Sequence, residues 1–145
     1  MGNKYLSEVI EEHKNEIFGT DKSNNNLVLI TAGVGAGKNT WVQEYLTKEL
    51  ENSEKILFIT SRKLIKEQIL KDKNFSTNYL DCKVCNHNYV ITHHSLKHFF
   101  QNAENFNKLL NMDFKYIVVD EVHSIISDAS YTDTAYYLYS LINFY

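Results

Sequence analysis

A glycine-rich segment that ends in a lysine, residues 32–39, has the residue types that bind phosphate groups. Its glycines let the backbone turn tightly, so that several N–H groups can point towards one anion. The start of a following helix adds partial positive charge, and Lys38 adds a full charge that can reach the β- and γ-phosphates of a nucleotide. We therefore predict a loop that binds ATP. Its candidate residues are Gly33, Val34, Gly35, Ala36, Gly37, Lys38, Asn39 and Thr40.

The two ends of this loop depart from the usual pattern, which reads GxxxxGK[ST]. The segment opens with Ala32 and closes with Asn39. The hydroxyl group at the last position normally binds Mg²⁺, and an Asn carbonyl oxygen can also ligate this kind of cation. Thr40 follows directly, but on a helix it points about 100° away. We expect ATP to bind, with Asn39 as a candidate Mg²⁺ ligand and with weakened turnover. The alternative is a glycine-rich turn with an exposed lysine.

Two adjacent carboxylates, Asp120 and Glu121, follow an apolar run at residues 116–119. The carboxyl ends of buried strands are where α/β sheets bind their ligands. Asp120 is therefore a candidate Mg²⁺ ligand, acting through water, and Glu121 a candidate general base for the attacking water. The alternative is a strand followed by an acidic turn in solvent.

The glycine-rich loop and the acidic pair must be positioned by the strands and helices that alternate around them. Short apolar runs predict strands, and apolar residues at helical spacing predict helices. This alternation indicates an α/β fold with a mainly parallel sheet in one domain, residues 1–145, with an N-terminal helix and loop at 1–26 and the core at 27–145. The predicted strands are 27–31, 56–60, 89–92 and 116–120, and the predicted helices are 4–18, 38–51, 62–71, 132–144 and one or two within 93–110.

Composition excludes some classes of protein. The chain has 145 residues, 43% of them hydrophobic, which suffices for one core. Its formal charge of −3 gives no support for a protein that coats nucleic acid, because such domains are usually basic. No apolar run reaches the roughly 20 residues of a membrane helix, and the polar N-terminus does not resemble a signal peptide. We therefore expect no membrane partner and a cytoplasmic location.

The segment from Asp120 to His123 reads D-E-V-H and resembles the D-E-x-H box of superfamily 2 helicases of the DEAD/DEAH type and related translocases. Thr60, Ser61 and Arg62 resemble motif Ia of that family, and residues 90–96 resemble a later motif at a strand end. The resemblance covers residues 27–128. It implies a three-layer P-loop NTPase (RecA-like) fold, ATP and Mg²⁺ as ligands, and DNA or RNA as the partner.

The resemblance also implies roles for residues beyond the loop and the acidic pair. His123 would couple ATP hydrolysis to nucleic-acid binding. Arg62 and Thr92 would contact backbone phosphates of the bound strand. For Arg62 the alternative is an exposed residue in the first turn of a helix.

The chain departs from this family at its end. Such motors place ATP between two RecA-like domains, and the second domain supplies arginines to the reaction. The sequence stops at Tyr145, before the family's motif III. The strand of that motif lies between the loop-bearing strand and the D-E-x-H strand. The resemblance therefore implies an incomplete sheet and a second RecA-like domain in the same or a partner chain, and the isolated chain is not expected to unwind nucleic acid.

Cys82 and Cys85 have the C-x-x-C spacing of zinc ligands. Histidines at positions 87, 93, 94 and 98 could complete a Zn²⁺ site. No second C-x-x-C pair follows, so two ordinary cysteines in a polar insert are the favoured interpretation.

Three other functions compete with a helicase. The chain could be another P-loop NTPase, such as a nucleotide kinase or a ring-forming motor, although it has few of the arginines that a kinase needs. It could be a non-catalytic module that binds a nucleotide or a partner, in which Asn39 marks the loss of catalysis. A zinc-stabilised interaction domain is the third alternative.

Overall fold

The computed structural model describes residues 5–18, 28–33, 35–51, 53–77, 88–112, 114–128 and 133–144. The chain divides into two compact units, Met1–Glu49 and Leu50–Tyr145, and each is described by itself. None of the helices in the described ranges is long and apolar enough to span a membrane.

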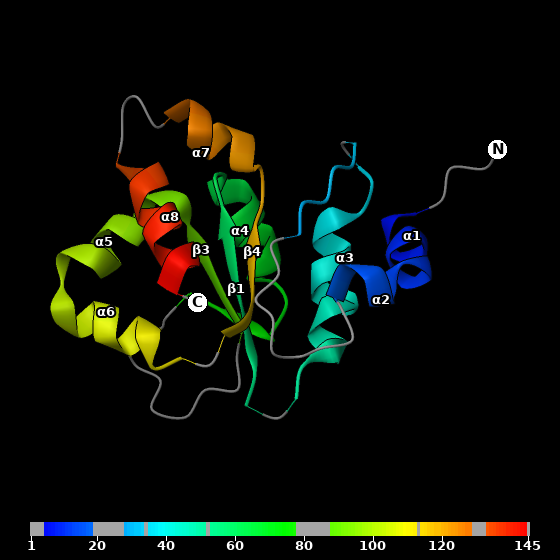
Figure 1. The fold of residues 1–145 in the computed structure, drawn as a ribbon, viewed down its shortest axis with the longest axis horizontal. Coiled ribbons are helices and arrows are strands. Elements are labelled where there is room, and N and C mark those ends of the chain that lie inside the picture. Colours follow the sequence, from blue (N-terminus) through cyan, green and yellow to red (C-terminus); the bar gives the residue numbers. More distant parts are fainter. Residues whose placement is uncertain are drawn as a thin grey trace. The chain divides into compact units, whose positions relative to one another are not determined.

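A parallel sheet forms the centre of the second unit (Figure 1). Its strands are β1 (Lys55–Thr60), β2 (Phe75–Ser76), β3 (Asn88–Thr92) and β4 (Phe114–Val119). They lie in the order β2-β3-β1-β4, and every pair is parallel. The predicted α/β class with a parallel sheet is confirmed. In this arrangement β4 forms one edge of the described sheet.

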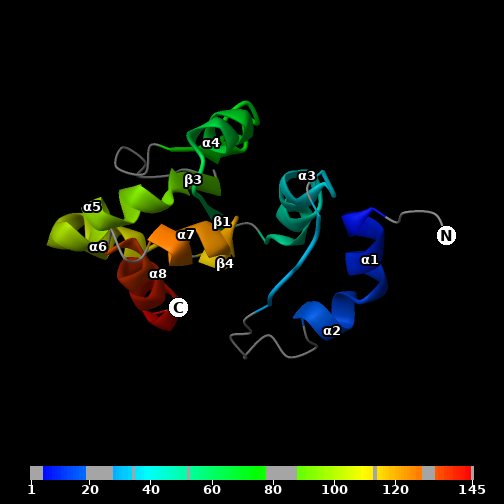
Figure 2. The same ribbon diagram turned by 90° about the horizontal axis from the view of Figure 1, so that it is seen from above.

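Helices connect β1 to β2 and β3 to β4, because a parallel arrangement needs a long crossover between strands. Figures 1 and 2 show α5, α6 and α8 against one face of the sheet and α4 against the other. The sheet therefore has helices on both faces. The helical elements of this unit are α4 (Lys63–Ile69), η2 (His93–Ser95), α5 (Leu96–Gln101), α6 (Ala103–Leu110), α7 (Val122–Asp128) and α8 (Thr134–Phe144).

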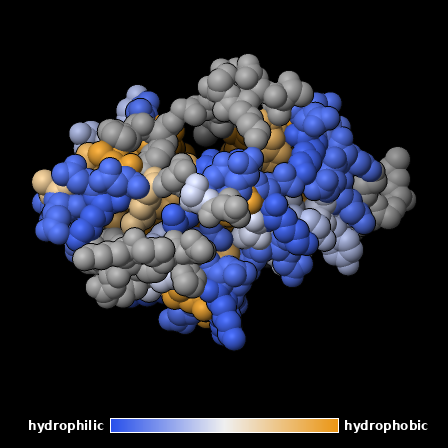
Figure 3. Space-filling model, turned by 90° about the horizontal axis from the view of Figure 1, so that it is seen from below, coloured by the Kyte–Doolittle hydropathy of each residue, from blue (hydrophilic) through white to orange (hydrophobic). Residues whose placement is uncertain are grey.

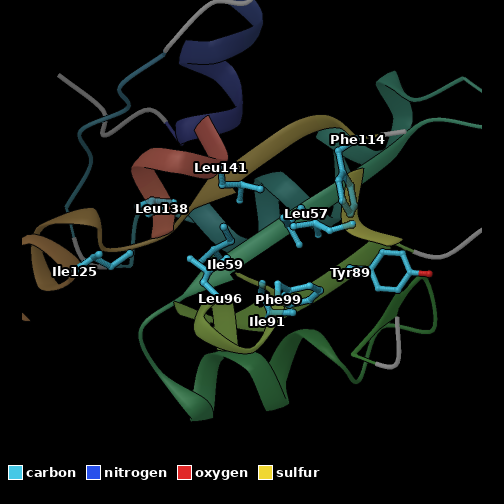
Figure 4. Close-up of a cluster of buried hydrophobic side chains, with 11 residues drawn as sticks. Leu57, Ile59, Tyr89, Ile91, Leu96, Phe99, Phe114, Ile125, Leu138 and Leu141 are labelled. Atoms are coloured by element: carbon cyan, nitrogen blue, oxygen red, sulfur yellow. The ribbon is translucent and has the colours of Figure 1, made fainter. Parts of the chain in front are cut away.

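Every second side chain along a strand lies on the same face of the sheet, and those on the face covered by α5 and α8 build the core there (Figure 4). Leu57 and Ile59 of β1 lie beside Ile91 of β3 and pack against helical residues such as Leu141, and all four are at most 2% exposed. Both faces of β1 are buried, which explains its continuous apolar sequence.

Asn102 divides the segment predicted to hold one or two helices. Its side chain accepts hydrogen bonds from Glu104 N at 2.9 Å and from Asn105 N at 3.2 Å. This is the bonding of a helix N-cap, so α5 ends before Asn102 and α6 begins after it.

The first unit contains α1 (Leu6–Glu12), α2 (Lys14–Phe18), α3 (Lys38–Glu44) and the 3₁₀ turn η1 (Leu46–Glu49). The helices predicted at 4–18 and 38–51 are therefore present, each divided into two pieces. Phe18 stacks on the buried Trp41 with ring centroids 6.2 Å apart, and Lys14 Nζ lies 2.5 Å from Glu49 Oε1. These two contacts tie α2 to α3 and η1.

The strand predicted at residues 27–31 is wrong for the residues that the structure describes. Residues 28–31 have no regular secondary structure, and Val28 and Leu29 are 41% and 76% exposed. An apolar segment becomes a strand only when a neighbour pairs with its N–H and C=O groups. The described residues of the first unit contain no strand that could pair with this segment, so its hydrophobicity alone does not produce a strand.

Exposed apolar side chains are scattered over the described surface. Among the largest exposures are those of Ile126 on α7 and of Tyr136 and Tyr139 on α8, each 66–68%. The face drawn in Figure 3 is mainly hydrophilic, with small separated hydrophobic areas. The coloured residues of this face therefore show no broad apolar surface.

Candidate functional site

The glycine-rich loop of the first unit has the backbone that its sequence predicts. Gly35 and Gly37 have φ values of 77° and 83°, in the left-handed region that favours glycine. Ala36 N donates to Gly33 O at 3.3 Å and closes a turn. A Cβ atom added at any of the three described glycines would meet no atom within 4 Å. Glycine is thus required by the backbone at 35 and 37, and no described atom crowds the Cβ position of these glycines.

Lys38 is the first residue of α3 and folds back over this loop. Its Nζ donates to Ala32 O at 2.9 Å and to Gly33 O at 3.3 Å. The ammonium group therefore lies at the loop, where it can exchange two neutral acceptors for phosphate oxygens. Asn39 is partly buried and Thr40 is exposed, whereas Val34 lies outside the described residues.

Asp120 follows β4 directly in the second unit. Its N–H donates to Ile59 O at 2.8 Å, which extends the pairing of β4 with β1. Its Oδ2 lies 3.4 Å from the hydroxyl oxygen of Thr60, the last residue of β1. The carboxylate is thus held at the carboxyl end of the sheet, the edge at which it was predicted.

Glu121 has a φ of 56° and is the one non-glycine residue with positive φ in the described ranges. Its carbonyl oxygen accepts from Ser124 N at 2.9 Å and from Ser124 Oγ at 2.8 Å, so the start of α7 holds this conformation. Its Oε2 lies 3.1 Å from His123 Nε2; the Glu121 side chain is 24% exposed and that of His123 76%. Strained backbone of this kind is frequent at functional sites.

The two candidate nucleic-acid contacts lie at the same edge of the sheet as Asp120. Thr92 ends β3 and is paired in register with Thr60 of β1. Its hydroxyl bonds Ser95 Oγ at 2.9 Å. Arg62 follows Thr60, is exposed, and forms the N-cap position of α4. The structure therefore brings Thr92, Arg62 and Asp120 to neighbouring strand ends.

The residues present fit a magnesium ion that is shared with a nucleotide. No group of three or more His, Cys, Asp or Glu side chains within the described ranges could hold a metal alone. Magnesium in such sites is commonly held by one or two carboxylates together with substrate phosphates. Asp120, fixed at a strand end, provides a ligand of this kind.

The described residues do not include the candidate zinc ligands that carry the C-x-x-C pattern. Cys82, Cys85 and His87 lie outside the described residues. His93 is buried at the start of η2, whereas His94 and His98 are exposed.

Two features of this edge were missed by the sequence analysis. Thr60 was treated only as part of a motif that contacts nucleic acid, and its approach to Asp120 depends on how β1 and β4 pair. The positive φ of Glu121 was not predicted either, because glutamate does not signal a left-handed backbone.

A glycine-rich loop that opens a helix, and a D-E-V-H turn that ends a parallel strand, are the features of a helicase-type ATP-binding domain of the RecA-like class. Residues 2–144 match the family described as "Type III restriction enzyme, res subunit", and the chain belongs to this family. The family's domain is a superfamily 2 helicase-type domain, which is ATP-dependent and acts on nucleic acids. Comparisons with curated proteins and with solved structures found no match.

Proposed function

We propose that this chain is the ATP-binding domain of a DNA or RNA helicase or translocase that hydrolyses ATP with Mg²⁺. One observation carries the proposal: Lys38 opens a helix directly after two left-handed glycines, in a chain that matches a helicase-type family from residue 2 to residue 144. A lysine in a solvated surface turn would not need this backbone.

Lys38 binds the phosphates of the nucleotide in this proposal. Its ammonium group leaves the carbonyls of Ala32 and Gly33, which it contacts at 2.9 and 3.3 Å, for charged phosphate oxygens. Hydrogen bonds between ionised partners are about twice as strong as neutral ones. The exchange therefore favours binding, and the N–H groups of the loop add further donors.

Asp120 and Asn39 hold the metal, and Glu121 acts on the water. Mg²⁺ bound there would neutralise charge on the phosphates. Glu121 orients the attacking water and accepts its proton. Its carboxylate is 3.1 Å from His123 Nε2, so a change in the position of His123 alters the group that receives the proton. This contact supports a coupling role for His123.

Arg62 and Thr92 contact the backbone of the nucleic acid in this proposal. Thr92 ends β3, Arg62 lies two residues after the end of the adjacent β1, and the exposed guanidinium of Arg62 can pair with a phosphate. A second RecA-like domain, in the same protein or in a partner, completes the ATP site and supplies arginines.

A non-catalytic nucleotide-binding module is the second candidate, and Asn39 favours it. The residue lacks the hydroxyl that binds Mg²⁺ in the usual loop. Such a module would bind ATP without turnover even when a second domain is present.

Hydrolysis measured on the chain together with a second RecA-like domain tests the proposal. We expect phosphate release that single-stranded DNA or RNA stimulates, and that Glu121→Gln reduces by about 100-fold or more, the range for loss of a general base. Glu67→Gln, an exposed carboxylate on α4, is the matched control. Tight ATP binding without any stimulated hydrolysis would favour the non-catalytic module.

A further inference from the structure

Thr60 is a polar side chain in a fully buried position. Its exposed fraction is 0%, and Thr60 is one of four buried polar residues in the described ranges, with Asn88, His93 and Thr134. Buried polar groups almost always form hydrogen bonds, because a lost bond in the interior is costly. The partners of the Thr60 hydroxyl therefore indicate what this side chain does.

The hydroxyl of Thr60 connects the start of α4 to Asp120. Arg62 N donates to Thr60 Oγ1 at 3.2 Å, and this bond uses the hydroxyl oxygen as an acceptor. The single hydroxyl hydrogen then remains for Asp120 Oδ2, 3.4 Å away. The direction of the chain is fixed: Arg62 N–H to Thr60 Oγ, and Thr60 O–H to the carboxylate.

We propose that Thr60 is a positioning residue for Asp120, whose carboxylate it orients as a ligand of the Mg²⁺ that accompanies ATP. This inference rests on the proposed function, because it takes Asp120 as the metal ligand. Groups that bond a metal-ligating carboxylate orient it and tune its affinity for the metal. A buried donor at the end of β1 is suited to this role because packing fixes its rotamer.

The neighbouring strand shows that packing alone does not dictate this contact. Thr92 occupies the equivalent position on β3, in register with Thr60. Its hydroxyl bonds Ser95 Oγ at 2.9 Å, within its own turn. A threonine that ends a strand here can thus satisfy its hydroxyl locally. Valine has the same shape and would fill the position equally well if packing were the whole role of Thr60.

The test is the affinity of Mn²⁺ for the protein in the presence of ATP, measured by electron paramagnetic resonance. We expect Thr60→Val to weaken Mn²⁺ binding by about tenfold, the lower range for loss of a group that orients a metal ligand. Thr60→Ser keeps the hydroxyl and should stay close to wild type. Asp120→Asn removes the proposed metal ligand and shows how much Mn²⁺ affinity depends on it. The affinity for ATP without metal should be the same in wild type and in these three variants.

Thr47→Val is the matched control, because it removes a hydroxyl that bonds only a backbone carbonyl, Gln43 O at 2.7 Å, in the first unit. It should leave Mn²⁺ affinity unchanged. If Thr60→Val does not fold, the Thr60→Ser and Thr60→Ala pair makes the same comparison, because both lack the methyl group and only one has the hydroxyl.

The outcomes separate this inference from the proposed function. Wild-type affinity in Thr60→Val, with affinity lost in Asp120→Asn, would overturn the role of Thr60 and leave the proposed function standing. Equal affinity in wild type and Asp120→Asn would overturn both, because Asp120 would then not be the metal ligand. Weakened binding in Thr60→Val, restored in Thr60→Ser, supports the positioning role.

Discussion

Glu121 adopts a positive φ of 56° just before α7, and exchanging its side chain tests whether this conformation stores strain. A residue with a Cβ atom loses about 1 to 2 kcal/mol in the left-handed region, and glycine does not. Glycine loses more chain entropy on folding, which costs about 0.5 to 1 kcal/mol relative to alanine. We therefore expect Glu121→Gly to be about 1 kcal/mol more stable than Glu121→Ala.

The comparison between these two variants isolates the contribution of the backbone at residue 121 to stability. Both remove the carboxylate and its contact with His123 Nε2 at 3.1 Å. Both keep the carbonyl oxygen that accepts from Ser124 N and Ser124 Oγ. What differs is the Cβ atom, so the difference in stability reports the strain that glycine relieves at positive φ, less the chain entropy that glycine loses on folding.

Urea unfolding followed by far-UV circular dichroism measures this difference. Trp41, the only tryptophan, belongs to the first unit, so its fluorescence would follow the wrong part of the chain. A difference of about 1 kcal/mol corresponds to about 4 °C in Tm at this size. Asn107, which is exposed in the middle of α6, is the control site. Asn107→Gly should be about 1 kcal/mol less stable than Asn107→Ala, the opposite order to that at Glu121, because glycine disfavours a helix. If E121G is no more stable than E121A, the strain argument is refuted.

Three further predictions concern an ion pair, a buried amide and the metal site. Lys115 Nζ lies 2.6 Å from Glu54 Oε2, and the side chains are only 24% and 23% exposed. Burial lowers the pKa of Lys115, but the hydrogen bond that it donates to Glu54 and the nearby charges raise this pKa above its ordinary 10.5 overall. The ion pair therefore stabilises the fold fully at neutral pH, and this stabilisation is lost as pH rises through the folded-state pKa of Lys115. Lys115→Met should lower the free energy of unfolding by about 1 to 2 kcal/mol at pH 7, measured by urea unfolding. A double-mutant cycle with Glu54→Gln should show coupling between the two side chains. Asn88→Ala should cost about 1 to 3 kcal/mol in the same assay, because Asn88 Oδ1 accepts from the buried Ile56 N at 2.8 Å, and an unchanged free energy of unfolding would contradict this. Asn39→Thr should tighten Mg²⁺-dependent ATP binding, since it restores the usual hydroxyl ligand, and unchanged affinity in a Mg²⁺ titration would remove Asn39 from the metal site.

Much of the sheet could be predicted because its signals are local. β1, β3 and β4 are short runs of branched and aromatic apolar residues, and such runs are typical of strands buried in a parallel sheet. The carboxyl ends of parallel strands meet at one edge. The position of Asp120 at the carboxyl end of the sheet followed from this rule.

The remaining features depend on partners that a local pattern does not contain. Residues 28–31 are as apolar as β1, but a strand also needs a paired neighbour, and the described residues of the first unit contain no other strand. The contact of Thr60 with Asp120 depends on the register of β1 against β4. The left-handed backbone of Glu121 is held by Ser124, three residues later, rather than favoured by its own side chain.

Binding of fluorescent ATP in the presence of Mg²⁺ tests the central claim most directly. The titration compares the wild-type chain with Lys38→Ala and with the control Lys48→Ala, and each protein is checked for folding. Lys48 is an exposed lysine of the same unit, and its Nζ lies over the Tyr45 ring. We expect saturable binding by wild type and by Lys48→Ala. The affinity of Lys38→Ala for ATP should be about 10- to 100-fold weaker, the effect of removing a charge-assisted contact of about 1.5 to 3 kcal/mol. No binding by a folded wild-type chain, or equal binding by all three, would contradict the claim.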